Sequence, residues 1–364
     1  MNKRILAGLG LLAIAALPLA AEDEALRRFV FGLPKAELHL HTEGTLDPAL
    51  YLKLAKRNGL ATPFADVAAV EERWREAKDL PSFIVIYEML LGVVRTPEDF
   101  RDMIGGYAQK ARAQGVVYAE LFFDPQLHLE RGLKLADIFA GLEAGRVAAA
   151  EAGVEVHFIM CFLRDRPVES ALQVLEASLP WRDRFIGVGL DNPEVKDFPQ
   201  KFLPVYTRAK ELGLHLTSHC DVGQVNTVAH HWAALNVLGV ERIDHGLNVL
   251  DDPALIEAVR SRHIGLTAVP SLFYRDIPGR MEYRAAAVKK LLELGLLVSV
   301  NSDDPGMKRG LYVGDLMLRV DQTVGLTREQ FVTLARNSFR ISWMPPEQRV
   351  KWLAAIDAYV AETP

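Results

Sequence analysis

Two histidines near the start of the chain have the spacing of metal ligands. His39 and His41 lie two residues apart in the apolar segment 36–41. Alternate side chains of an extended strand point to the same face, so both imidazoles project from one side while Leu38 and Leu40 project from the other. Neutral imidazole suits a divalent cation, but a complete site needs about two further protein ligands. Alone, the pair indicates only the start of a site, and two partly exposed histidines are the alternative.

Further ligand types follow three later apolar segments. These polar groups are Ser218 to Asp221, Asp244 to Gly246, and Asn301 to Asp304. His219 and Asp303 could complete a four-ligand zinc site with His39 and His41, with room left for water. A divalent ion lowers the pKa of its water to about 7 and so makes a nucleophile. A single buried histidine is usually only a hydrogen-bonded core residue, but several ligand types at neighbouring strand ends favour a metal site.

Three other residues could transfer protons or bind a substrate. His245 could accept a proton from the attacking water. Asp221 could be a carboxylic acid that the pocket keeps protonated. Asp304 could accept a hydrogen bond from a substrate N–H. The alternatives are a loop cap at Asp221 and an ordinary turn at Asp304.

The order of apolar segments predicts how these residues are positioned. Eight extended segments are expected at 36–41, 116–123, 154–162, 185–191, 215–220, 242–246, 264–270 and 297–303. Helical segments between them are expected at 97–114, 135–152, 205–212, 253–261 and 283–294. Parallel strands joined by helices predict an α/β fold, a (β/α)8 TIM barrel whose active site lies at the carboxyl ends of the strands.

The segment 48–96 is longer than one crossover and predicts extra helices after the first strand. Its part 78–94 carries apolar residues at helical spacing. Packing on the core is the preferred interpretation of this face, and a substrate lid is the alternative.

Composition limits the class of protein. The 364 residues are 50% hydrophobic and 24% charged, which fits one globular domain. The net charge of -5 comes without a long basic run, so nucleic-acid binding is not expected. Two cysteines, Cys161 and Cys220, exclude a disulfide scaffold and a CxxC metal cluster.

The N-terminus has the pattern of an export signal. A basic start at residues 2–4, an apolar run over 5–19 and small residues before Glu22 predict a signal peptide at 1–21. Residues 22–364 would then form the metal-dependent barrel domain, which would work in the periplasm or outside the cell without stable membrane insertion. An uncleaved anchor and a buried N-terminal helix are the alternatives.

Several motifs resemble one known family. Residues 34–46 read PKAELHLHTEGTL, 242–246 read RIDHG and 300–305 read VNSDDP. This pattern closely resembles the adenosine/adenine deaminase branch of the amidohydrolase superfamily. The segments 118–126 (YAELFFDPQ) and 159–164 (IMCFLR) resemble the adenine-type members more than the nucleoside type.

The resemblance implies an enzyme that hydrolyses the 6-amino group from a small-molecule purine base or nucleoside. It implies one zinc ion held by His39, His41, His219 and Asp303. Activated water, helped by His245, would attack C6 while an acid protonates N1, and ammonia would leave. Asp304 would bind N7, and the backbone from Gly189 through Asp191 to Asn192 would lie near the other edge of the purine.

The chain departs from the family pattern at the acid. Members usually read His-Ala-Gly-Glu, whereas residues 219–223 here read HCDVG, so the acid is assigned to Asp221. Glu43 stands where nucleoside-specific members have an aspartate against the ribose, which favours a free base, including one substituted on N6. Candidates for the pocket wall, with core packing as the alternative, are Thr42, Phe83, Leu272, Phe273 and Tyr274.

Two other functions stay open at this point. One is an amidohydrolase that acts on a different amide or ester, because fold and metal do not fix the substrate. The other is a purine-binding protein without turnover. A cytidine-deaminase type of zinc site is excluded, because the chain lacks His-x-Glu followed by Pro-Cys-x-x-Cys. The oligomeric state is not predicted.

Overall fold

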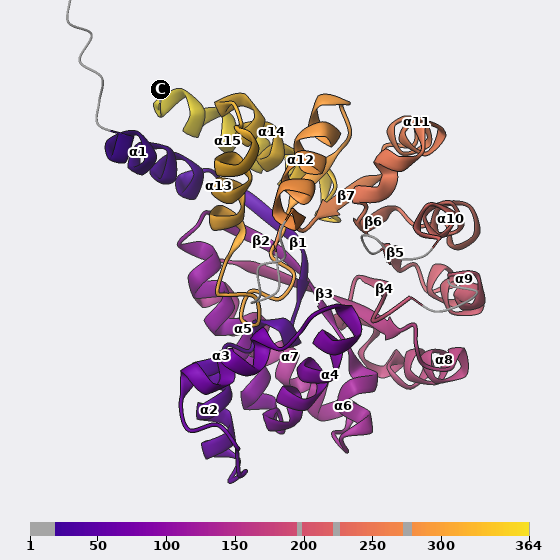
Figure 1. Ribbon diagram of the computed structural model, residues 1–364. Coiled ribbons are helices and arrows are strands. Elements are labelled where there is room, and N and C mark those ends of the chain that lie inside the picture. The colour runs from indigo at the N-terminus through magenta and orange to yellow at the C-terminus, as the bar shows by residue number, and fades with distance from the viewer. Residues whose placement is uncertain (1–18, 195–198, 221–225, 272–278, 364) are drawn as a thin grey trace, which may run out of the picture.

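A parallel eight-stranded sheet forms the centre of the computed structural model, which describes residues 19–194, 199–220, 226–271 and 279–363 (Figure 1). The strands are β1 (Lys35–His41), β2 (Val116–Phe123), β3 (Glu155–Leu163), β4 (Gly187–Asp191), β5 (His215–Cys220), β6 (Arg242–His245), β7 (Gly265–Ala268) and β8 (Val298–Val300). They are paired in sequence order, and a bridge between Leu40 and Asp303 joins the two ends. The predicted (β/α)8 barrel is confirmed.

The strands are buried because helices cover the outside of the barrel and side chains fill its interior. Every residue of β1 and β2 is buried. This explains the near-continuous apolar runs that mark parallel strands in the sequence. The strand β8 is shorter than the expected segment 297–303: it ends at Val300, and Asp303 pairs with β1 only through the isolated bridge to Leu40.

The helices follow the strands around the barrel. They are α1 (Leu19–Gly32), α2 (Pro48–Arg57), α3 (Val67–Arg75), α4 (Leu80–Leu90), α5 (Pro97–Arg112), α6 (Pro125–Glu130), α7 (Leu135–Glu151), α8 (Val168–Ala177), α9 (Leu203–Glu211), α10 (Thr227–Ala233), α11 (Pro253–Ser261), α12 (Arg280–Glu293), α13 (Val313–Val324), α14 (Arg328–Arg340) and α15 (Pro346–Glu362). Figure 1 shows α8 to α11 in an arc outside β3 to β7. The extra helices predicted after the first strand are α2, α3 and α4.

Local sequence signals start these extra helices. Asp47 caps α2 by accepting a hydrogen bond from the Leu50 amide at 2.8 Å, and Pro48 occupies the first turn. Asp79 and Ser82 form a capping box at the start of α4. The start of α4 matters because this helix lies over the pocket described below.

Two buried charged residues fix β1 in the barrel. The Lys35 ammonium donates hydrogen bonds to the carbonyls of Val30, Leu33 and Gln114 at 2.6 to 2.7 Å. The Glu37 carboxylate accepts from the Tyr107 hydroxyl at 2.6 Å and from the Ser302 amide at 2.9 Å. Glu37 therefore ties β1 to the turn that carries Asp303.

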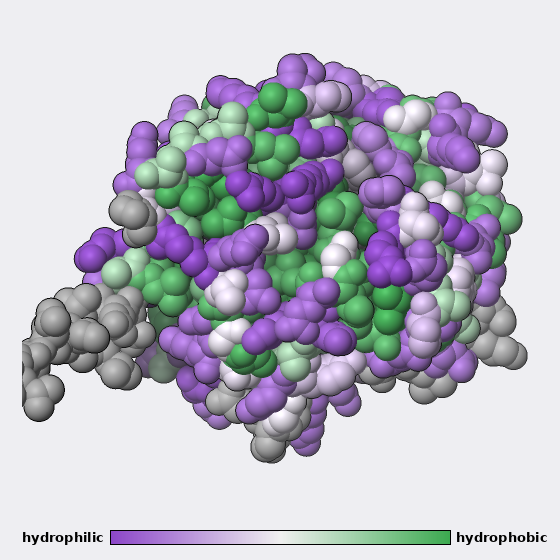
Figure 2. All heavy atoms as spheres, turned by 90° about the horizontal axis from the view of Figure 1, so that it is seen from above, coloured by the Kyte–Doolittle hydropathy of each residue, from purple (hydrophilic) through white to green (hydrophobic). Residues whose placement is uncertain are grey.

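The two ends of the described chain lie together. The Tyr359 hydroxyl of α15 donates to the Phe29 carbonyl of α1 at 3.0 Å. Figure 2 shows hydrophilic and hydrophobic residues interspersed over one face of the molecule. Within the described ranges no single helix is long and apolar enough to span a membrane, and only the bent pair Leu80–Val93 and Pro97–Arg112 passes that test, by length and composition.

Candidate active site

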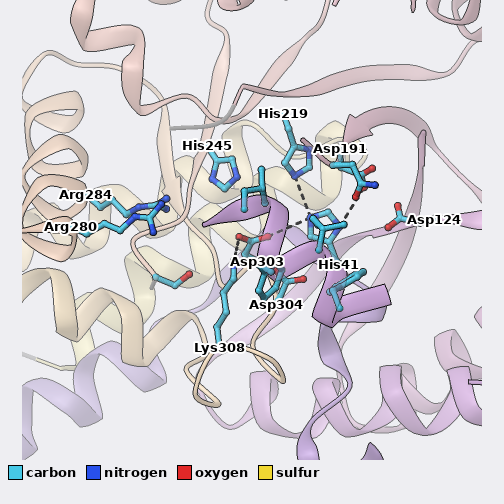
Figure 3. Close-up of a pocket in the computed structure, with 16 residues that line it drawn as sticks. His41, Asp124, Asp191, His219, His245, Arg280, Arg284, Asp303, Asp304 and Lys308 are labelled. Carbon is cyan, nitrogen blue, oxygen red and sulfur yellow. Dashed lines mark hydrogen bonds and ion pairs between the residues drawn. The ribbon is translucent and has the colours of Figure 1, made fainter. Parts of the chain in front are cut away.

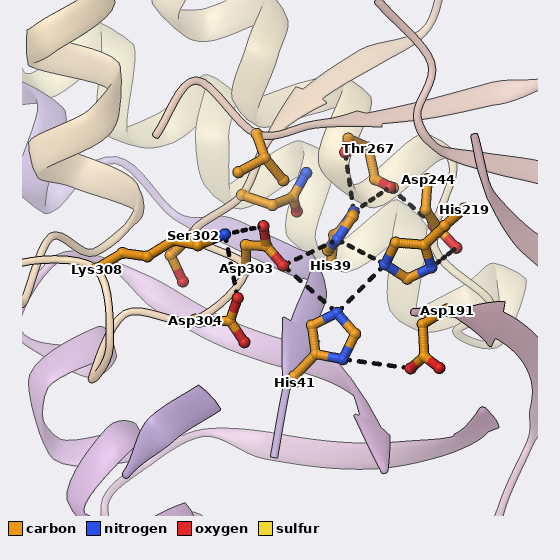
Figure 4. A network of polar contacts seen from close by, with 12 residues as sticks. His39, His41, Asp191, His219, Asp244, Thr267, Ser302, Asp303, Asp304 and Lys308 are labelled. Carbon is orange, nitrogen blue, oxygen red and sulfur yellow. Dashed lines mark hydrogen bonds and ion pairs between the residues drawn. The ribbon is translucent and has the colours of Figure 1, made fainter. Parts of the chain in front are cut away.

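Four side chains from three strand ends meet at one point of the barrel. The Nε2 atom of His219 lies 3.1 Å from Nε2 of His39 and 3.2 Å from Nε2 of His41. Asp303 Oδ1 lies 3.4 Å from Nε2 of each β1 histidine. Figure 4 shows these four groups turned toward one another. The structure thus brings together all four residues predicted as metal ligands.

A hydrogen bond orients the His39 ring, and a carboxylate faces the outer nitrogen of each of the other two imidazoles. Nδ1 of His39 lies 3.2 Å from the Thr267 carbonyl, which can only accept, so Nδ1 carries the proton and Nε2 does not. Nδ1 of His41 faces the Asp191 carboxylate at 3.6 Å. Nδ1 of His219 faces Asp244 at 3.7 Å. Such partners are typical of histidines that bind a metal.

This donor set fits a divalent cation. In a tetrahedral zinc site with ligand bonds of about 2.0–2.1 Å, the ligand atoms lie about 3.3–3.4 Å apart. Four of the separations among these ligand atoms, which measure 3.1 to 3.4 Å, are close to that value. Converging lone pairs and a carboxylate repel one another unless a cation lies between them. This cluster of histidines and an aspartate can therefore hold a metal ion.

Burial and neighbouring charges set the ionisation of these groups. Burial lowers the pKa of His39 to about 4 and holds the pKa of His219 well below its usual range. Burial opposes ionisation of Asp303, but the Lys308 ammonium and His39 hold its pKa well below the usual range. At neutral pH His39 and His219 are therefore neutral imidazoles and Asp303 is a carboxylate, which are the forms that bind a metal.

Carboxylates surround His41. Burial favours the neutral ring, but Asp304, Asp303 and Asp191 raise the pKa of His41. Burial, then the charge of Asp303, raises the pKa of Asp304 to about 6, while Lys308 opposes the shift from 3.1 Å away. This negative field attracts a proton or a metal cation to the site.

His245 lies beside the ligands at the end of β6. Its ring centre is 4.6 Å from that of His39 and 5.5 Å from that of His219. Burial lowers its pKa to about 3. Both His245 (φ 64°) and Asp303 (φ 66°) have left-handed backbone, which costs about 1–3 kcal/mol for such residues. The fold holds these two side chains in position at the cost of local strain.

A pocket of about 780 Å³, including its mouth, opens onto these groups. Leu80, Phe83, Ile84 and Tyr87 of α4 form its apolar wall. The face of α4 expected to pack on the core therefore also lines the pocket. Figure 3 shows Asp124 and Asp191 at one end, Arg280 and Arg284 at the other, and His219 and His245 between them.

Not every predicted site residue reaches this pocket. Glu43 is buried and its Oε1 lies 2.8 Å from Nε2 of His128, and Glu43 is not among the described residues that line the pocket. The same holds for Thr42, and for Gly189, whose Cβ position would lie 2.8 Å from Sγ of Cys161 inside the barrel. Asp191, Asp304 and Phe83 do line the pocket.

Other predictions fall in segments outside the described residues. The general acid assigned to Asp221 is one of them, because 221–225 is not described. The pocket-wall candidates Leu272, Phe273 and Tyr274 are likewise outside the described ranges.

Sequence reasoning assigned no role to several residues of the site. Lys308 pairs with Asp303 and lies 3.1 Å from Asp304. Asp244 accepts hydrogen bonds from the Thr217 and Thr267 hydroxyls at 2.7 and 2.8 Å. The buried position of Asp244 at a strand end was a usable signal, because buried charges are usually paired. Lys308 lies in a loop without any pattern that marks it.

Fold and site together define a class of protein. A parallel barrel that gathers histidines and an aspartate around a water-accessible pocket at its carboxyl edge is a hydrolase of the amidohydrolase type.

Comparisons with known proteins narrow the class. Residues 34–359 match the family model of adenosine deaminase. Adenine deaminase of Streptomyces coelicolor is 45% identical over 332 residues, which are 90% of this chain and 96% of that protein. Adenine deaminase of Caulobacter vibrioides is 40% identical over 334 residues, with 92% and 96% covered.

Solved structures agree with this result. The crystal structure of adenine deaminase from Arthrobacter aurescens has a TM-score of 0.83 at 34% identity and covers 90% of this chain and 99% of that one. An amidohydrolase from Burkholderia ambifaria, solved with bound zinc, shares the fold, with a TM-score of 0.82 at 24% identity and 96% and 97% covered.

The chain belongs to the adenosine deaminase family. It is a hydrolase that acts on carbon–nitrogen bonds other than peptide bonds, in cyclic amidines. The resemblance to adenine-type members, inferred from the motifs at 118–126 and 159–164, is confirmed.

Proposed function

We propose that this protein is a zinc-dependent aminohydrolase that converts a 6-aminopurine, adenine in the first place, into the 6-oxopurine and ammonia. The observation that carries the proposal is the cluster at the pocket, in which His219 Nε2 lies 3.1 and 3.2 Å from the Nε2 atoms of His39 and His41, and Asp303 Oδ1 lies 3.4 Å from each of those two atoms. Relatives named adenine deaminase, one of them 45% identical, support the choice of substrate.

We assign one zinc ion to His39, His41, His219 and Asp303. When bound, it supplies Lewis-acid activation of water at neutral pH. Imidazole nitrogens with one carboxylate oxygen are ligands that zinc accepts readily.

The chain's own residues move the protons. His245 is buried beside the ligands with a lowered pKa, so its neutral ring can take a proton from the water that attacks C6. Asp221 follows β5 directly in the sequence and is the proposed donor of a proton to N1. The C–O bond forms at C6, the C6–N bond breaks, and the amino group leaves as ammonia.

Other residues position the purine. Asp304 follows the ligand Asp303, lines the pocket and is proposed to hydrogen-bond N7. Lys308, 3.1 Å from Asp304, fixes that carboxylate. The apolar wall of α4 excludes water from the ring face.

The environment of Glu43 supports a free base rather than a nucleoside. Its Oε1 accepts a hydrogen bond from the Asp124 amide at 3.1 Å and faces Nε2 of His128 at 2.8 Å. This carboxylate is buried and is not among the described residues that line the pocket, so it is poorly placed to bind the hydroxyl groups of a ribose. An N6-substituted adenine stays within the proposed substrate class.

We also propose export, because residues 1–21 have the pattern of a signal peptide. N-terminal sequencing of protein recovered from the periplasm should begin near Glu22. A cytoplasmic protein that retains residues 1–21 would contradict export.

The proposed activity is tested with purified, zinc-loaded protein and a panel of adenine, adenosine and N6-substituted adenines. The expected result is a shift in ultraviolet absorbance together with release of ammonia, largest for the free base. Tight binding of adenine without ammonia release would instead indicate a binding protein. Turnover of amide or ester panels alone would indicate a different amidohydrolase.

A further inference from the structure

Two arginines lie side by side at one end of the active-site pocket. Arg280 and Arg284 are one helical turn apart at the start of α12, and both line the pocket (Figure 3). Burial, and then the charge of Arg280, lowers the pKa of Arg284 to about 10. A buried cation such as Arg284 is usually paired with an anion.

The guanidinium of Arg284 is not fully hydrogen-bonded within the described residues. Its Nη1 donates to the Val269 carbonyl at 2.8 Å, but its buried Nε has no hydrogen-bond partner among the described residues. Within the described ranges no carboxylate forms an ion pair with Arg284. Ser271 also lines the pocket and is 5% exposed, and its Oγ atom has no hydrogen-bond partner within the part of the chain that the structure describes. Buried donors are usually satisfied, so these two groups indicate a ligand that the protein itself does not supply.

The proposed function places the substituent on N6 beside these groups, and the inference rests on that function. Asp304 at N7 lies after β8, and Asp221 at N1 follows β5. The exocyclic nitrogen lies between N1 and N7 on the purine, so it faces the arc of β6 and β7. Ser271 follows β7, and α12 begins shortly after it. The N3 and N9 edge faces the other arc, where Asp124 and Asp191 lie.

We propose that Arg284, with Arg280 beside it and Ser271 nearby, binds a carboxylate carried on the N6 substituent of the substrate. The amine released is then an anionic one, such as an amino acid. For N6-carboxymethyladenine the reaction takes up one water. The C6–O bond forms, the C6–N6 bond breaks, and the nitrogen receives a proton and leaves as glycine beside hypoxanthine.

The test compares two substrates of the same shape with the zinc-loaded enzyme. N6-carboxymethyladenine carries the charge, and N6-carbamoylmethyladenine replaces it with a neutral amide. The expected result is at least a tenfold higher kcat/KM for the charged substrate, mainly through KM. Equal values, or preference for the amide, would overturn the inference, and this comparison does not depend on any variant.

Variants then test which side chain recognises the carboxylate of the substrate. Arg284→Gln should bring the ratio of the two kcat/KM values to about one, and Arg284→Lys should restore part of the preference. Lys290→Gln removes the same charge from an exposed position of α12 and should leave the ratio unchanged. A ratio that stays high in Arg284→Gln would contradict the assignment.

Nucleotides distinguish the other source of an anion. A preference for AMP over adenosine that disappears in Arg284→Gln would place the anion on the N9 side and overturn the N6 assignment. Turnover of adenine without preference among the N6 substrates would leave the proposed function standing and refute only the inference. Absence of turnover on every purine would refute the proposed function itself.

Discussion

Asp191→Asn tests whether the carboxylate at the end of β4 orients a metal ligand or binds the substrate. Asp191 Oδ2 lies 3.6 Å from Nδ1 of His41, and neither carboxylate oxygen of Asp191 has a hydrogen-bond partner among the described residues. The substitution keeps the shape and removes the charge. The packing contacts of the side chain are therefore largely kept, and the effect reports on the charge.

The size of the effect follows from the distance. Two full charges 3.6 Å apart interact by about 5 kcal/mol at an effective dielectric constant of about 20. An imidazole bound to a metal carries only part of a charge, so the loss should be smaller. Substitution of such outer partners typically lowers metal affinity about 10- to 100-fold, or about 1–3 kcal/mol.

The assay is a zinc competition titration with a chromophoric chelator, run beside steady-state kinetics on adenine. The expected result for Asp191→Asn is a 10- to 100-fold weaker zinc affinity, with activity largely restored by excess zinc. Asp165→Asn is the control, because Asp165 forms its ion pair with Arg166 and none with a histidine within the described ranges. Unchanged zinc affinity with a raised KM would refute the orienting role and favour a substrate contact.

Three further predictions concern the elements that hold the site. A Cβ at Gly44 would lie 2.7 Å from Cα of Asp304, so Gly44→Ala should lower kcat/KM at least tenfold. Gly106→Ala is the control, because a Cβ at Gly106 would meet open space and should leave kcat/KM unchanged. Equal kcat/KM values for the two variants would contradict this packing. Tyr107→Phe removes the hydrogen bond to Glu37 and should lower the free energy of unfolding by about 1–3 kcal/mol in urea denaturation; no change would show that the bond is not stabilising. Burial lowers the pKa of Lys35 from 10.5 to about 7. Between these pH values the unfolded chain holds a proton that the folded protein has lost, so the stability of the wild type should rise with pH relative to Lys35→Met, by roughly 1 kcal/mol per pH unit. If the difference in stability between the wild type and Lys35→Met stays constant from pH 7.5 to pH 9.5, the lowered pKa of Lys35 is contradicted.

Much of the barrel could be predicted because parallel strands leave a strong local signal. Strands such as β2 and β5 are short apolar runs bounded by turns, and the observed bounds of both agree with the expected ones. The pair His39 and His41 points inward together because side chains of a strand alternate. Ligands at strand ends were predictable for the same reason, since the barrel brings all carboxyl ends to one edge.

The remainder depends on tertiary contacts that no local pattern carries. Lys308 reaches Asp303 from a loop, and Arg284 reaches the pocket from the outer helix α12. Glu43 illustrates the opposite case, since its position in the motif suggested a substrate contact while its side chain pairs with His128. Glu43 and His128 are 85 residues apart in the sequence, so only the folded chain identifies them as partners.

The most direct test of the central claim is a titration of metal-free protein with zinc while adenine deamination is followed. The account predicts no activity without metal and a linear rise that ends at one zinc per chain, with His219→Ala showing no rise at all. Full deamination by protein whose measured metal content is far below one ion per chain would contradict it.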